Sequence, residues 1–84
     1  MQTLQELGEA VAARRRSLGL KQGEVAIRAG ISQDVLSRFE LGKSAEFGSR
    51  KLLSVLAVLG MELQFADTTA SGSLDELRRE RGGV

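Results

Sequence analysis

Apolar residues recur every three or four positions along most of this chain, which is the spacing of amphipathic helices. The pattern predicts helices over residues 3–18, 22–29, 33–41 and 50–60. A glycine stands at the end of each predicted helix, where it can take the left-handed conformation that closes a helix. The pattern therefore predicts a helical fold.

The inward faces of these helices follow from the same spacing. The residues expected in the core are Leu4, Leu7, Val11, Leu18, Val25, Ala26, Ala29, Leu36 and Phe39. Thr3, Ser32 and Ser49 stand where a side-chain oxygen can cap a helix N-terminus. The helix over 50–60 is apolar nearly all round, so it must be covered on more than one side. We expect a second subunit to supply part of that cover.

Residues 61–66 change to the alternation of apolar and polar residues that is typical of a strand. The rest of the sequence has no matching pattern, and a strand alone leaves its backbone N–H and C=O groups unpaired. We therefore expect the segment to pair antiparallel with its copy in a two-fold symmetric homodimer. The alternative is a fifth, frayed turn of helix.

Residues 67–84 begin as a linker and continue into a short helical pattern over 73–81 with two leucines as anchors. So short a helix is marginal in isolation. We therefore divide the chain into a folded domain over 1–66 and a tail over 67–84 that is flexible or folds on a partner.

Composition limits the chemistry that the chain can perform. Its 84 residues are enough for one small domain. It contains no Cys and no His, so it lacks a thiolate and the usual neutral-pH acid–base group and metal ligand. We therefore expect neither an enzyme nor a cofactor or metal. No apolar run reaches the roughly 18–20 residues that span a bilayer and no secretory signal is evident, so we expect a cytoplasmic protein without a membrane partner.

The stretch from Leu20 to Lys43 carries the strongest functional signal. It reads as two short helices joined by a tight turn over 29–32, which is the arrangement of a DNA-reading helix-turn-helix. The outer face of the second helix holds short or planar polar groups: Gln33, Asp34, Ser37 and Arg38. A face that is only solvated would more often carry Glu and Lys. These side chains are better suited to hydrogen bonds with base edges. The net charge is only +1, so this face indicates DNA binding more strongly than the composition does.

The sequence LGLKQGEVAIRAGISQDVLSRFELGK over 18–43 strongly resembles the phage-repressor/Cro-type family, also called XRE-type helix-turn-helix domains. The matching residues are Leu18, Gly19, Leu20, Gln22, Glu24, Val25, Ala26, Ala29, Gly30, Ile31, Ser32, Leu36, Ser37, Phe39, Glu40, Gly42 and Lys43. The resemblance implies an all-α, lambda-repressor-like bundle of four or five helices, with a short C-terminal strand paired across a dimer. The ending LGMELQFAD is most similar to the HipB-like antitoxin branch.

The resemblance also implies which residues read the bases of DNA. Gln33 would bond bidentately to an adenine edge, and Arg38 would reach guanine or a phosphate. Ser37 would contact either a base or the DNA backbone. Asp34 departs from the pattern expected at a base-facing position, and it would either accept from cytosine N4 or repel phosphate and narrow the set of targets.

Other positions are implied to hold the phosphates. Gln22 opens its helix and would hydrogen-bond a phosphate at a helix N-terminus, where the dipole favours an anion. Lys43 would hold the opposite run of phosphates. Ser32 would share in phosphate contact in addition to capping its helix.

Arg15 and Glu40 occupy positions that form a partly buried ion pair in several relatives of this family. A buried carboxylate without a partner would be costly, which supports the pairing on physical grounds. Arg14 and Arg16 would then remain for solvent or phosphate. The other interpretation of these arginines is that they favour the negative end of the helix dipole.

These features predict a sequence-specific repressor that acts as a homodimer on double-stranded DNA. The antitoxin branch adds the expectation of a toxin kinase of the HipA type as a protein partner. The alternative is a protein-interaction adaptor that kept the fold and lost DNA binding, which the near-neutral charge and Asp34 favour and the pair Gln22 and Gln33 opposes.

Overall fold

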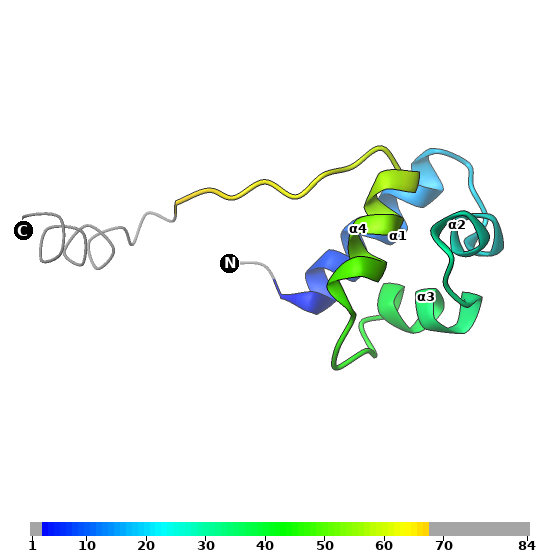
Figure 1. Cartoon of the computed structure of the whole chain (residues 1–84), viewed down its shortest axis with the longest axis horizontal. Coiled ribbons are helices and arrows are strands. Elements are labelled where there is room, and N and C mark those ends of the chain that lie inside the picture. The colour runs from blue at the N-terminus through cyan, green and yellow to red at the C-terminus, as the bar shows by residue number, and fades with distance from the viewer. Residues whose placement is uncertain (1–2, 68–84) are drawn as a thin grey trace, which may run out of the picture.

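Four helices form the part of the chain that the computed structural model describes, residues 3–67 (Figure 1). They are α1 (Leu4–Ser17), α2 (Gln22–Ala29), α3 (Gln33–Glu40) and α4 (Ser49–Val58). Helix α1 packs against α3, and α2 packs against both α3 and α4. The predicted all-helical bundle is confirmed, with helix bounds close to those expected from the sequence.

Local capping explains where the helices begin and end. The Thr3 hydroxyl accepts the Glu6 N–H at 3.1 Å, and the Ser32 hydroxyl accepts the Val35 N–H at 3.1 Å. Gly30 closes α2 in the left-handed conformation with φ +72°, which a side chain would disfavour. The expectation for Ser49 was wrong, because Gly48 is the N-cap of α4 and Ser49 is its first helical residue.

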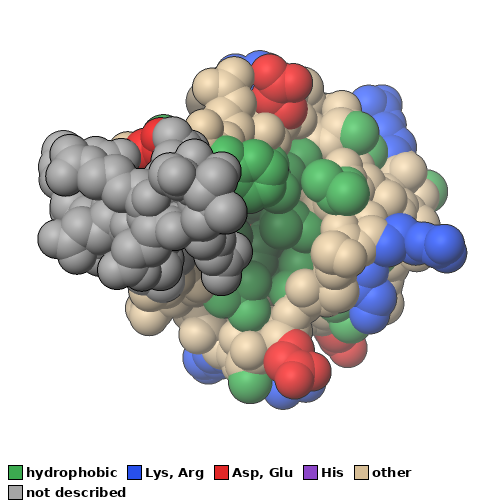
Figure 2. Space-filling view, turned by 60° about the vertical axis from the view of Figure 1, so that its left-hand side comes forward, with side chains coloured by type: hydrophobic (Ala, Val, Ile, Leu, Met, Phe, Trp, Pro, Cys, Tyr) green, Lys and Arg blue, Asp and Glu red, His purple; other side chains and the backbone are tan. Residues whose placement is uncertain are grey.

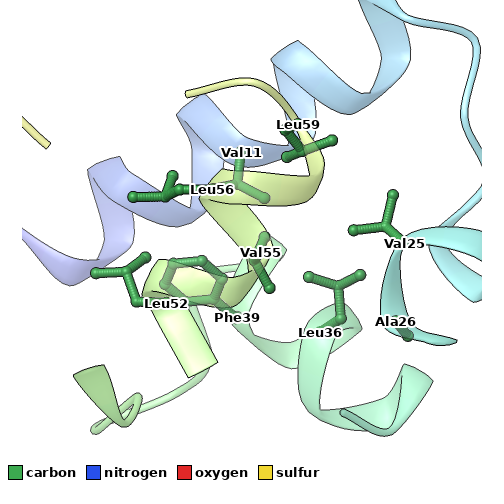
Figure 3. Close-up of a cluster of buried hydrophobic side chains, with 9 residues drawn as sticks. All are labelled: Val11, Val25, Ala26, Leu36, Phe39, Leu52, Val55, Leu56 and Leu59. Carbon is green, nitrogen blue, oxygen red and sulfur yellow. The ribbon is translucent and has the colours of Figure 1, made fainter. Parts of the chain in front are cut away.

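The hydrophobic core gathers side chains from all four helices (Figure 3). Its buried members are Val11, Val25, Ala26, Leu36, Phe39, Leu52, Val55, Leu56 and Leu59. The ring of Phe47, in the loop before α4, stacks on Phe39 with centroids 4.0 Å apart. Leu18 was wrongly expected in the core, because it lies beyond the last residue of α1 and is 43% exposed.

Helices α1 and α3 come into close backbone contact at Gly8. A Cβ on this buried glycine would lie 2.0 Å from the Phe39 carbonyl oxygen, which is far inside van der Waals contact. Gly8 therefore sets how closely the first helix can pack on the third. The hydrophobic periodicity gave no sign of this contact, because it involves a residue without a side chain.

Residues 61–67 leave the bundle as an extended segment that is neither helix nor strand (Figure 1). The predicted strand is therefore not formed in the single chain. Its backbone would need a second strand to pair with, and residues 3–67 contain none. The alternative fifth helix turn is not formed either. The helix predicted over 73–81 lies outside the described residues.

Candidate nucleic-acid interface

Helix α3 is anchored by its buried face and presents its polar face to solvent. Leu36 and Phe39 are fully buried in the core, while Gln33, Asp34 and Arg38 are exposed. The predicted outward orientation of these polar side chains is thus confirmed. Ser37 lies between the two faces and is half-buried, so it is less accessible than Gln33, Asp34 and Arg38.

A shallow recess in front of the first turn of α2 brings together side chains from three helices. It is lined by Arg15, Lys21, Gln22, Gly23, Glu24 and Gln33. The Gln33 carboxamide lies over Gly23, where an added Cβ would sit 3.4 Å from its Oε1 atom. Two of the predicted DNA-contacting residues, Gln22 and Gln33, therefore share one surface although they belong to different helices.

Arg38 lines a separate recess formed where the α3–α4 loop meets the start of α4. The other lining residues are Val35, Ser44, Ala45, Glu46, Phe47, Gly48 and Lys51. Sequence reasoning did not single out Val35 or Lys51. Their proximity to Arg38 depends on how the loop folds back over α3, and Phe47 holds this loop by stacking on Phe39.

A polar network joins α1, α2 and α3 next to the recess lined by Gln22. Arg15 donates from Nε and Nη2 to the two carboxylate oxygens of Glu40, each at 2.8 Å. Arg15 Nη1 donates to the Leu20 carbonyl at 2.9 Å, and Gln22 Nε2 donates to Glu40 Oε1 at 2.9 Å. The ion pair expected between Arg15 and Glu40 is confirmed, but the bond from Gln22 was not foreseen.

Burial and hydrogen bonding act in opposite directions on Glu40. Burial alone would raise the pKa of its carboxyl, but hydrogen bonds from Arg15 and Gln22, with the charges of Arg15 and Arg16, lower that pKa below its ordinary value. The pKa of Arg15 is raised, chiefly by its hydrogen bond to Glu40. Both groups are therefore charged at neutral pH.

The three arginines at the end of α1 have different environments. Arg14 Nε donates to the Leu59 carbonyl at 3.0 Å, at the C-terminus of α4. Arg14 is exposed, as expected, but this contact also gives it a structural role at the end of α4 that was not foreseen. Arg16 is exposed as well, whereas Arg15 is half-buried.

The family described as "Helix-turn-helix domain" matches residues 6–64, which is most of the chain. The chain belongs to this helix-turn-helix family. No curated protein matches the sequence at a significant level. Family membership indicates a DNA-binding regulator in general terms and agrees with the XRE-type resemblance at that level.

The charges of the helix-turn-helix domain are mostly free on its surface. Within residues 3–67, the pair of Arg15 and Glu40 is the only ion pair. Arg38 and Lys43 are exposed, so both can meet a phosphate without first leaving an acidic partner in that part of the chain. Asp34 lies on the same helix as Arg38 and adds a negative charge to this surface. None of the four helices within residues 3–67 combines the length and the hydropathy of a membrane-spanning segment.

Proposed function

We propose that this helix-turn-helix protein is a sequence-specific transcriptional repressor that binds a palindromic operator as a homodimer. The exposed polar face of α3 supports the proposal best, because the core holds it outward beside the start of α2. Helix α3 would enter the major groove, and Gln33, Asp34 and Arg38 would reach base edges. The protein would act by binding, without a catalytic step.

The phosphate contacts would come from the edges of the same surface. Gln22 at the N-terminus of α2, with Ser32 at the start of α3, would face one strand. Lys43, just past the end of α3, would face the other. Ser37 is half-buried, so we assign it a minor part.

The proposal is tested by selecting binding sites from a library of randomised duplexes. The wild-type protein should enrich one palindromic motif, and its affinity for that motif should fall steeply as salt rises. Gln33→Ala should lose the preference at one position of each half-site, at a cost of about 1–3 kcal/mol. Gln5→Ala is the matched control, because Gln5 is an exposed glutamine on α1, outside both the helix-turn-helix and the proposed dimer contact.

A flat salt response without an enriched motif would contradict the repressor proposal. That result would favour the adaptor, which kept the fold and uses α3 to bind a protein. Asp34 is the observation that supports this second candidate, because an exposed carboxylate on α3 opposes the approach of phosphate.

An open apolar face supports the homodimer. Leu53 is 54% exposed and Phe65 is 97% exposed, and both line a groove with Leu56, Ala57, Met61, Glu62 and Leu63. Figure 2 looks onto a side of the molecule where apolar side chains gather around a hollow. A second copy would cover this face and pair residues 61–66 as strands across a two-fold axis. The two α3 helices would then reach half-sites one helical turn apart.

We further propose that the protein belongs to the HipB-like branch and acts as the antitoxin of a kinase toxin. The similarity of the ending LGMELQFAD to that branch supports this assignment. The tail over 67–84 would be available to such a partner. Co-purification with the product of a neighbouring kinase gene would test the assignment, and a DNA-binding protein that captures no kinase would contradict it.

A further inference from the structure

We infer that Glu40 positions Gln22 for its contact with DNA, so that the ion pair in the core also supports the nucleic-acid surface. The inference rests on the proposed function and deepens it, because it assigns a DNA-binding role to a residue that DNA cannot touch. Glu40 is only 6% exposed. It is the last residue of α3, at the other end of the helix from Gln33.

Both carboxylate oxygens of Glu40 accept hydrogen bonds. Oε2 accepts from Arg15 alone, whereas Oε1 accepts from Arg15 and from the Gln22 carboxamide. The Gln22 side chain is therefore held by a charged acceptor, and such bonds are stronger than bonds between neutral groups. One N–H of the carboxamide is used by Glu40, and the second remains to donate.

Gln22 joins this network to the surface. It is half-buried, and it lines the recess in front of α2 together with Gln33. A free glutamine side chain would sample several rotamers, and ordering it on binding would cost conformational entropy. Glu40 removes that cost in advance by fixing the carboxamide at the edge of the recess.

Arg15 makes this arrangement compatible with an anionic ligand. A bare carboxylate behind the recess would repel a phosphate, but the guanidinium of Arg15 binds both of its oxygens. Arg15 is itself fixed by the Leu20 carbonyl, just before α2 begins. The pair therefore offers Gln22 an acceptor without presenting a net negative charge.

For Glu40→Ala, a positioning role and a purely electrostatic effect predict opposite changes in DNA affinity. Removing a negative charge near the DNA should strengthen binding if charge alone matters. Removing the acceptor of Gln22 should weaken binding by about three- to tenfold, the worth of one hydrogen bond. The salt dependence should not change, because Gln22 is neutral and releases no counterion. Glu9→Ala, which removes an exposed acid from α1, is the matched control and should not weaken binding.

The experiment measures, by fluorescence anisotropy, binding to a short labelled duplex that carries the enriched palindromic motif. The temperature is one at which circular dichroism shows each variant to be folded. Glu40→Ala and Gln22→Ala should weaken binding equally, and the double variant should bind no worse than either. Glu40→Gln, which keeps an acceptor, should restore most of the affinity. Full additivity of the two losses, or unchanged or tighter binding by Glu40→Ala, would overturn the inference.

Replacing both partners of the ion pair keeps the test valid if Glu40→Ala does not fold. Arg15→Met combined with Glu40→Met leaves no unpaired buried charge and does not change the net charge. It should weaken binding, and adding Gln22→Ala should weaken it no further. If the wild-type protein itself fails to bind the duplex at low salt, the proposed function fails; if it binds and these variants bind equally well, only the inference fails.

Discussion

The junction of α1, α2 and α3 differs in kind from the face around α4 and residues 61–65. At the junction, Gly8 allows close packing and Glu40 satisfies Arg15 and Gln22, so the contacts are completed within one chain. Around α4, apolar side chains such as Leu53 stay exposed. The contrast teaches that one region serves the fold of the monomer, whereas the other has the character of a surface that another molecule covers.

The largest effect is expected at the junction, from Gly8→Ala. The new methyl group would meet the Phe39 carbonyl oxygen, so α1 would have to move away from α3, at a cost of about 3 kcal/mol or more. Gly23→Ala is the matched control, because its methyl group would meet only Gln33 at 3.4 Å and would favour the helix by up to about 1 kcal/mol. Thermal melts should separate the two variants widely; similar melting temperatures would contradict the close approach at Gly8.

An intermediate effect is expected from acid. The folded state holds the pKa of Glu40 below its unfolded value, so Glu40 contributes stability that is fully present above the unfolded pKa. This contribution is lost as the pH falls through the folded pKa, when the carboxyl becomes protonated. Denaturant melts should show wild-type stability falling more steeply below about pH 4 than that of Glu40→Gln, which has no carboxyl to protonate there. Parallel pH profiles would argue against the network.

The smallest effect on the folded monomer is expected on the apolar face. Leu53→Ser should change stability by no more than about 0.5 kcal/mol in dilute protein, because Leu53 is 54% exposed. The same change should lower the mass measured by light scattering from dimer to monomer. Ile27→Ser is the control, since Ile27 is 82% exposed on α2 and lies outside the groove. A wild-type monomer, or equal dimerisation of both variants, would contradict the proposed interface.

Much of the fold could be predicted because helix ends depend on local chemistry. Gly30 closes α2 and Ser32 caps α3, each through bonds to residues a few positions away. The burial of Leu36 and Phe39 and the exposure of Gln33 follow from helical periodicity in the same local way. The polar face of α3 could therefore be predicted without knowing any contact between helices.

Other predictions depended on partners that the pattern could not identify. Alternation over residues 61–66 indicates which residues a strand would expose, but a strand forms only where another backbone accepts its hydrogen bonds. Arg14 is exposed as expected, but its bond to the Leu59 carbonyl, 45 positions away, was not foreseen. No spacing rule within one helix can anticipate such a bond.

The sequence by itself determined the four helices, their buried faces and the polar face of α3, because each depends on interactions within a few residues. Only the tertiary structure decided that Gly8 contacts Phe39, that Arg14 supports α4 and that Gln22 bonds to Glu40. These contacts join residues 18 to 45 positions apart, and their geometry is fixed by how whole helices pack.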